Sequence, residues 1–290
     1  MTDHVVVLGD AAVDVVVHPA AAVAPGGDVP ATIRRTIGGA GANTAAWLAF
    51  LGAPTALMAR VGDDPEGRRI AADLTARGVD CRFAVDPEAP TCAVVVMVDA
   101  TGQRTMYSDR GAAARLAVPD LDADVMATAK HLHVSGYLLL DPLSRLAAVA
   151  ALTAAAAAGV TTSVDPQTAV AMGPELLDLV GGVDLLLPNA DELAALTGSP
   201  DPESARDLLD VVGSVVVTAG HAGATWVDRI GMHTAPAVEV TSVDTTGAGD
   251  AFNAGLIAAL INDAPDPLTH AIATAATAVT QPGAAPPKLP

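Results

Sequence analysis

Short apolar runs alternate with longer alanine-rich or amphipathic segments along most of the chain. The apolar runs predict strands at 4–10, 54–62, 131–139, 160–166, 183–189, 214–220 and 238–244. The intervening segments predict helices at 42–52, 64–78, 190–198, from 146 onward and in the final part of the chain. Apolar strands of about four to eight residues that alternate with helices are typical of a parallel sheet covered on both faces. We therefore expect an α/β fold with a mostly parallel central sheet and helices on both faces.

Two regions depart from this alternation. Residues 14–39 and 91–111 have the pattern of β hairpins with turn residues, and "ATGQ" (100–103) is the expected turn of the second. They predict a small separate sheet, or lid, over one edge of the main body. Because no repeat or linker interrupts the chain before its proline-rich end, we expect residues 1–290 to form a single domain with this lid.

Charge and composition exclude several classes of partner. The formal net charge is −18, which argues against nucleic acid and against an anionic membrane surface. The uncharged run 146–164 is long enough to span a membrane, but it is mostly alanine, so a helix packed on the sheet and a following strand are expected instead. The acidic N-terminus does not resemble a signal peptide, and the two cysteines, Cys81 and Cys92, form no metal-ligand pattern. We expect a cytoplasmic protein with free thiols.

The stretch "SVDTTGAGDAFNAGL" (242–256) carries the clearest chemistry. It predicts a strand, a tight turn at Gly247-Ala248-Gly249 and a helix whose first turn includes Asp250. Bare backbone N–H groups at a helix start bind anions, yet an aspartate there would repel one. An anion-binding helix start beside an aspartate is explained if Asp250 takes a proton from a hydroxyl that then attacks a bound phosphate. The alternative is that Asp250 only caps the helix and the glycines only form a turn.

Two common nucleotide-binding motifs are excluded by spacing. A P-loop needs a lysine directly after its second glycine, and neither Lys130 nor Lys288 follows a glycine. "GAGDAF" and "GAGANT" begin like a dinucleotide-binding turn but lack its closing glycine. A dinucleotide-dependent oxidoreductase is therefore disfavoured.

Three stretches together resemble a known family. "DTTGAGDAFNAG" (244–255), "GGAGANTAAWLAFLGAPTALMARVGDDPEG" (38–67) and "LLPNADELAALTG" (186–198) are similar in order and spacing to the signatures of the ribokinase-like, or PfkB, carbohydrate kinases. The resemblance covers essentially the whole chain. It implies ATP-dependent phosphorylation of a hydroxyl of a small sugar, with ATP and Mg²⁺ as cofactors and K⁺ as a further candidate.

The resemblance also implies roles for residues of the reaction centre. Asp250 matches the catalytic base, and Gly247, Ala248 and Gly249 match the anion hole for the transferred phosphate. Asn189 and Glu192 match a pair that helps to place Mg²⁺ through water. Taken alone, this pair would rather be a helix cap and its capping-box partner.

Further positions match the nucleotide side of the family site. The segment "TAGHAG" (218–223) resembles a nucleotide-contacting loop, in which Thr218, Gly220 and Gly223 are the candidate contacts. The stretch 276–284 resembles the wall beside the adenine. Asp244 and Thr246 match residues that face a monovalent cation.

For the acceptor, Asp14, Gly39 and Asn43 match positions that bind sugar hydroxyls. As local features, Asp14 could be a turn residue and Asn43 a helix cap. The chain departs from the ribokinase pattern at Ala40, where a lysine is usual, and at Leu140, where a glutamate is usual, so ribose itself is expected to be a mediocre acceptor.

Four further polar residues have either a functional or a purely structural interpretation. Arg104 and Arg110, in the lid segment, are candidates to contact a phosphate or an acidic sugar, or else to lie on solvated surface. His131 and His133 are expected at the edge of the core and not as metal ligands.

Two other functions stay open at this point. The first is phosphorylation of a nucleoside by the same chemistry, and the second is a non-catalytic sensor of sugar or nucleotide. A homodimer formed through the lid is a candidate assembly for each of these functions.

Overall fold

A nine-stranded sheet forms the centre of the computed structural model, which describes residues 4–22, 25–99, 103–170, 172–173 and 175–287. The strand order is β13-β12-β11-β10-β9-β8-β1-β4-β5. Every neighbouring pair from β11 to β5 is parallel, and β12 and β13 add an antiparallel hairpin at one edge. The bounds are β1 (Val5–Leu8), β4 (Thr55–Gly62), β5 (Val79–Asp86), β8 (His131–Ser135), β9 (Thr161–Asp165), β10 (Leu185–Leu186), β11 (Ser214–Thr218), β12 (Ala224–Val227) and β13 (Met232–Ala235). The expected mostly parallel sheet is confirmed.

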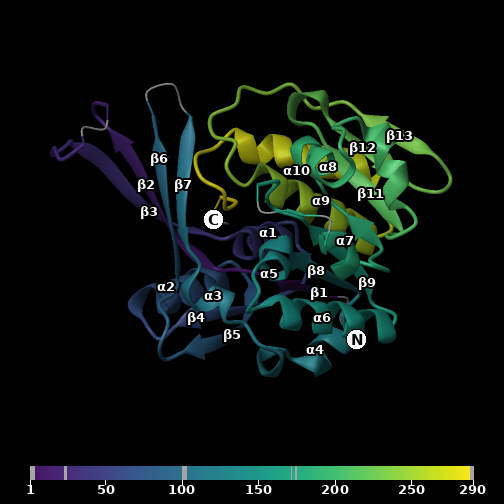
Figure 1. Cartoon of the computed structure of the whole chain (residues 1–290), viewed down its shortest axis with the longest axis horizontal. Helices are drawn as coiled ribbons and strands as arrows, with labels where there is room; N and C mark the ends of the chain where they lie inside the picture. Colours follow the sequence, from purple (N-terminus) through teal and green to yellow (C-terminus); the bar gives the residue numbers. More distant parts are fainter. Residues whose placement is uncertain (1–3, 23–24, 100–102, 171, 174, 288–290) are drawn as a thin grey trace.

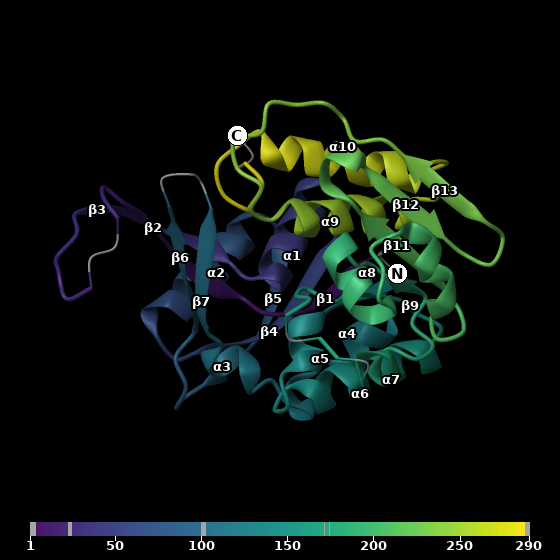
Figure 2. The ribbon, with the colours of Figure 1, turned by 45° about the horizontal axis from the view of Figure 1, so that its top comes forward.

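Alternate residues of the strands face two separate cores. In β1, Val5 and Val7 pack among residues of α1, α2 and α9, while Val6 and Leu8 pack among residues of α4 to α8. Figure 2 shows α1, α9 and α10 on one side of the strands and α4, α6 and α7 on the other. The helices are α1 (Ala40–Phe50), α2 (Pro65–Ala76), α3 (Gly111–Ala114), α4 (Ala123–Ala127), α5 (Gly136–Leu140), α6 (Arg145–Ala157), α7 (Glu175–Leu179), α8 (Ala190–Thr197), α9 (Ala248–Ile261) and α10 (Pro267–Val279). Helices on both faces are therefore also confirmed.

Three strand predictions need correction. The run 131–139 is a strand only to Ser135, because Gly136 packs against the backbone of Asp165 and Pro166 and begins the helix α5. The run 183–189 keeps only two strand residues, since Pro188 has no N–H to continue the ladder. Residues 238–244 form no strand, and the β12–β13 hairpin that ends before them was not predicted.

A second sheet of four strands forms the predicted lid. Its order is β3-β2-β6-β7, built from β2 (Ala12–Pro19), β3 (Ala31–Gly38), β6 (Cys92–Val98) and β7 (Arg104–Asp109). Figure 1 shows these strands projecting from one side of the body. Segments 14–39 and 91–111 thus pair as expected, whereas the turn predicted at 100–103 falls mostly on residues outside the described part.

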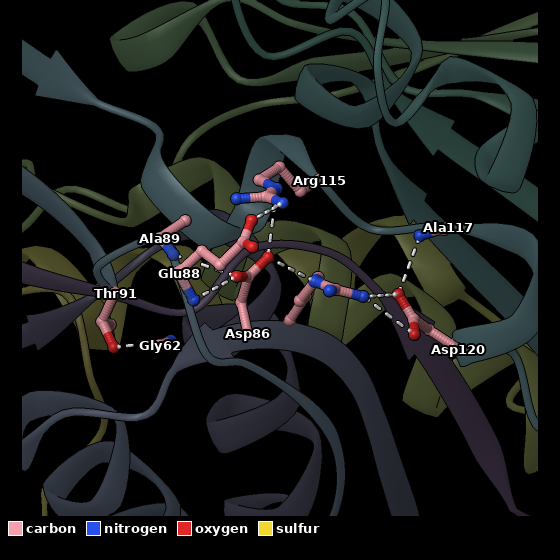
Figure 3. A network of polar contacts seen from close by, with 9 residues as sticks. Gly62, Asp86, Glu88, Ala89, Thr91, Arg115, Ala117 and Asp120 are labelled. Carbon is pink, nitrogen blue, oxygen red and sulfur yellow. Dashed lines mark hydrogen bonds and ion pairs between the residues drawn. The ribbon is translucent and has the colours of Figure 1, made fainter.

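A network of ion pairs and hydrogen bonds lies where the chain passes from the central sheet into the lid (Figure 3). Arg60 donates to Asp86 and Asp120 at 3.0 and 2.8 Å, and Arg115 pairs with Asp86 at 3.2 Å. Backbone N–H groups of Ala89 and Glu88 also bind Asp86 and, with Arg60, lower its pKa to about 2. The carboxylate therefore stays charged and ties the end of β5 to the segment that leads into β6.

In the described part of the chain, no helix combines the length and apolarity needed to cross a membrane. The uncharged run 146–164 divides into α6, of 13 residues, and the strand β9.

His131 and His133 are buried in the core, where both rings hydrogen-bond to Ser163 Oγ at 2.7 and 2.8 Å.

Candidate active site

The carboxyl ends of the central strands and the start of α9 enclose a cavity of about 210 Å³. Ligands of open parallel sheets commonly bind at this edge. The cavity wall contains seven of the predicted catalytic, nucleotide and metal residues side by side with residues that were not predicted. It consists of Asp165, Gln167, Leu187, Asn189, Glu192, Thr218, Thr245, Gly247, Ala248, Gly249, Asp250 and Asn253.

Asp250 lies in the first turn of α9 and is 9% exposed. Its Oδ2 accepts a hydrogen bond of 2.8 Å from Nδ2 of Asn43. Burial, and secondarily the nearby carboxylates of Asp165, Asp10 and Asp14, raise its pKa well above the usual range, against the lowering effect of Asn43. The helix cap is Gly247, so the alternative reading of Asp250 as a cap is wrong.

Gly247, Ala248 and Gly249, the residues predicted to form an anion hole, lie at the start of α9. Gly247 has φ +73° and precedes the helix, and a Cβ there would lie 2.5 Å from the Cβ of Ala284. Only glycine combines this conformation with such close packing. The first backbone N–H groups of a helix have no intrahelical partner, so this turn presents donors and the positive end of the dipole to an anion.

A second cavity, of about 850 Å³, adjoins the first. Both cavities are lined by Thr218, Thr245, Ala248 and Gly249. The start of α9 therefore lies between the two cavities. Gly220 and Gly223, predicted to contact the nucleotide, also line the larger cavity. Its remaining wall is largely apolar and comes from residues 236–242 and from α10. A polar end at α9 and an apolar far end suit a triphosphate and a flat base, respectively.

Asn189 and Glu192 form a capping box and also line the smaller cavity. Oδ1 of Asn189 accepts from the N–H of Glu192, and Oε2 of Glu192 accepts from the N–H of Asn189, each at 2.9 Å. Burial and the neighbouring Asp165 raise the pKa of Glu192 to about 8. The capping role of Asn189 and Glu192 is thus confirmed. Capping alone does not explain why the carboxylate of Glu192 is buried next to that of Asp165.

Asp165, at the end of β9, was not predicted. It accepts a hydrogen bond of 2.6 Å from Nδ2 of Asn253, and burial raises its pKa to about 6. Among the residues described, no group of three or more His, Cys, Asp or Glu side chains is placed to hold a metal ion directly. The carboxylates of Asp165 and Glu192 nevertheless fit Mg²⁺, which prefers oxygen ligands and keeps several of its waters.

The predicted acceptor residues meet on the lid side of Asp250. Asp14 lies in β2 and is not a turn residue, while Asn43 lies inside α1 and does not cap it. Gly39 is the α1 cap, with φ +93° and close packing on the backbone of Asp10. Burial, and then the neighbouring Asp10, raise the pKa of Asp14 to about 7.

Asp10 is a further buried carboxylate that sequence reasoning missed. Nη1 of Arg110 lies 3.4 Å from Oδ2 of Asp10, and its guanidinium stacks 4.6 Å above the ring of Tyr137. Oδ1 of Asn43 and Nη2 of Arg110 are buried without a hydrogen-bond partner among the residues described. The signal that could have found Asp10 and Asp165 is their position, since each lies at or just beyond the carboxyl end of a buried strand.

Asp244 and Thr246 lie together, but Asp244 already has a positively charged partner. Its Oδ1 accepts from N and Oγ1 of Thr246 at 2.9 and 2.7 Å and from Nη2 of Arg104 at 2.6 Å. Its Oδ2 accepts from the N–H of Gly283 at 2.9 Å. The monovalent cation expected at these two residues stays a prediction.

The sequence of the chain matches known carbohydrate kinases. The model of the pfkB family carbohydrate kinases matches residues 2–290. A fructokinase of Klebsiella pneumoniae is 35% identical over 271 residues, which cover 90% of this chain and 85% of the relative.

Solved structures agree with this match. The adenosine kinase of Sinorhizobium meliloti superposes with a TM-score of 0.88 at 25% identity, covering 99% of this chain and 96% of the other. A protein of E. coli described as a ribokinase II, solved in complex with ATP and Mg²⁺, gives 0.81 at 26% identity and covers 97% of this chain and 94% of the other. The chain therefore belongs to the pfkB family of carbohydrate kinases, ATP-dependent phosphotransferases that act on a sugar hydroxyl.

Proposed function

We propose that Asp250 is the base that takes the proton from the acceptor hydroxyl as its oxygen attacks the γ-phosphorus of ATP. One observation carries this proposal: Asp250 and the turn 247–249 line one cavity, and two residues of that turn also line the larger cavity. The bond from the γ-phosphorus to the β–γ bridging oxygen breaks, and ADP leaves. The N–H groups at the start of α9 stabilise the negative charge that develops on the transferred phosphoryl group.

ATP and Mg²⁺ are the cofactors of this family, and the residues present fit both. We propose that Thr218, Gly220 and Gly223 contact the nucleotide, and that Asn189, Glu192 and Asp165 hold the waters of Mg²⁺. The metal supplies positive charge that offsets the phosphates. Asp165 and Glu192 orient the metal's waters, and Asn253 holds Asp165 in place.

Replacement of Glu192 by glutamine tests the metal role. Glutamine keeps the capping box with Asn189 but removes the charge. We expect the Mg²⁺ concentration for half-maximal activity to rise about tenfold or more, the range for outer-shell metal contacts, with little change in melting temperature. Glu203→Gln, in the exposed first turn of a 3₁₀ helix, is the matched control. An unchanged Mg²⁺ midpoint in Glu192→Gln would leave Glu192 as a capping residue only.

We propose a small neutral sugar as the acceptor, bound by Asp14, Asn43 and the backbone at Gly39. Asp10, Asp14 and Asp250 accept hydrogen bonds from hydroxyls and would repel an anion. The unpartnered Oδ1 of Asn43 and Nη2 of Arg110 give one further acceptor and one donor. A buried polar atom without a partner favours a ligand that supplies one.

Asp14 is expected to dominate the affinity for the sugar. Asp14→Ala should raise the KM for the acceptor by about 10- to 100-fold, since hydrogen bonds to a charged group are lost, while the KM for ATP changes much less. Hydroxyls donate to the ionised carboxylate, which predominates above its pKa of about 7. The acceptor KM of the wild type should therefore rise as the pH falls below 7, and that rise should be absent in Asp14→Asn. Equal losses for ATP and sugar would remove Asp14 from the acceptor site.

A nucleoside is the second candidate acceptor, because the adenosine kinase of Sinorhizobium meliloti superposes over nearly the whole chain. Release of ADP should be measured with pentoses, hexoses, keto-sugar acids and nucleosides. Turnover with a neutral keto- or aldo-sugar at least tenfold above that with any nucleoside or sugar acid supports the proposal. Preference for a nucleoside would replace it, and ribose is expected to be a mediocre substrate.

We propose further that the lid pairs two copies of the chain. The strand register places Ile33, Val95 and Tyr107 on the face opposite Asp14, and all three are exposed. Light scattering should give the mass of a dimer, and Ile33→Lys should shift it toward the monomer. A monomeric wild type would contradict this.

We also propose that residues 1–290 act as one domain in the cytoplasm. The free thiols of Cys81 and Cys92 suit a reducing compartment. A tagged copy found outside the cytoplasm would contradict the location, and two separate unfolding transitions would contradict the single domain.

A further inference from the structure

An ion pair joins the lid to the loop that precedes the anion hole. Arg104 is the first residue of β7, and its Nη2 lies 2.6 Å from Oδ1 of Asp244. Its Nη1 also lies 3.5 Å from Oγ1 of Thr245. The two charged side chains are 25% and 24% exposed, so water screens the pair only in part. In Figures 1 and 2 the β6–β7 hairpin stands beside the C-terminal segment, on the side of α9 and α10.

Asp244 holds both sides of the anion-hole turn. Through N and Oγ1 of Thr246 it fixes the residue directly before Gly247. Through the N–H of Gly283 it fixes the residue directly before Ala284, against which Gly247 packs. The position of Gly247 therefore depends on a carboxylate that lies outside the cavity.

The donors around Asp244 already include a cation. An ionised carboxylate has about two lone-pair sites on each oxygen. Thr246 donates twice and Arg104 once to Oδ1, which fills that oxygen, and Gly283 donates once to Oδ2. The guanidinium already supplies a full positive charge, so the donor set does not fit a potassium ion as well.

We infer that Arg104, carried by the lid, takes the place of a monovalent cation at the anion-hole loop. This inference rests on the proposed function, because it concerns the loop assigned to phosphate binding. Arg104 is thus a positioning residue that acts through Asp244, Thr246 and Gly283, and the enzyme needs no potassium.

The test compares wild type with Arg104→Gln in potassium chloride and in tetramethylammonium chloride at equal ionic strength. The wild type should have the same kcat and melting temperature in both salts. Arg104→Gln should lose about tenfold or more of kcat in tetramethylammonium, since one partner of a half-buried charge pair is removed. Potassium should then restore most of that activity and raise the melting temperature of this variant alone.

Two further variants separate the charge from a general effect on the lid. Arg104→Lys keeps the charge and should stay insensitive to potassium. Arg35→Ala removes another lid arginine, which pairs with Glu66 at 3.4 Å on the surface, and should behave as wild type.

Potassium activation of the wild type, a defect in Arg104→Gln that potassium does not relieve, or the same defect in Arg35→Ala would each overturn the inference. The melting temperatures are measured without acceptor or ATP. They therefore test Arg104 even if the chain phosphorylates none of the compounds tried, a result that would count against the proposed function alone.

Discussion

Asp250→Asn is expected to lower kcat by about 10²- to 10⁴-fold, the contribution usual for a positioned general base. Asparagine has nearly the same shape and can still accept a hydrogen bond from Asn43, so the fold around α9 should be kept. The KM for ATP should change little, because removing a negative charge near the phosphates does not weaken their binding. Steady-state kinetics with saturating sugar and Mg²⁺·ATP measure both quantities.

The same variant has a second expected result that separates chemistry from damage to the fold. Asp250 is buried near Asp165, Asp10 and Asp14, and this repulsion is relieved when one member becomes neutral. The melting temperature should therefore stay equal or rise while kcat falls. Asp228→Asn, in the turn between β12 and β13, is the control and should have normal turnover. Near-normal turnover of Asp250→Asn would exclude Asp250 as the base.

Gly247→Ala is expected to lower kcat by about 10²- to 10³-fold, comparable to the loss of one donor in an oxyanion hole. A Cβ at Gly247 would lie 2.5 Å from the Cβ of Ala284 and 3.0 Å from its carbonyl oxygen. Either the C-terminal loop or the turn itself must move, and the N–H groups of the turn would no longer point at the transferred phosphoryl group. Binding of ATP, measured by calorimetry, should weaken as well.

Gly159→Ala is the matched control for this prediction. Gly159 has φ +72°, almost the same as the +73° of Gly247, but a Cβ there would meet nothing within 4 Å. Both variants carry the strain of an alanine in the left-handed region, roughly 1 kcal/mol. If Gly159→Ala loses as much activity as Gly247→Ala, backbone strain explains the effect and the anion hole does not.

Local features of the site could be predicted from the sequence because each is set by neighbouring residues. The capping box of Asn189 and Glu192 follows from short-range spacing, and so does a helix after Gly247 that has Asp250 in its first turn. The same holds for the buried strands of the parallel sheet, whose apolar runs have no solvent-facing alternation.

The missed residues depend on topology. Asp10 and Asp165 lie far apart in the sequence, and neither belongs to a motif on its own. They approach Asp250 because β1 and β9 each pair with β8 in one parallel sheet, so that their carboxyl ends share an edge. The order of the strands in the sheet brings these residues together, and the hydrophobic periodicity of a single sequence does not give that order.

The wrong strand at 238–244 has a different cause. Its valines alternate with polar residues as in a half-buried strand, yet Val238, Val240 and Val243 are 50%, 41% and 62% exposed. The segment lies along the larger cavity instead of in the sheet, and its backbone N–H groups at Val243 and Asp244 donate to the carbonyl oxygen of Val279 in α10. A pattern made by residues that line a cavity can thus imitate one made by a core.

The carboxylates of Asp10, Asp14, Asp165 and Asp250 also bear on how long the molecule survives in a cell. Asp250 and its three acidic neighbours repel one another, and binding of Mg²⁺ is expected to relieve that repulsion. The unloaded chain is then the form that opens most readily to proteases. Nutrient supply would set the lifetime of the enzyme as well as its rate, and the half-life in dilute protease with and without ligands would report it.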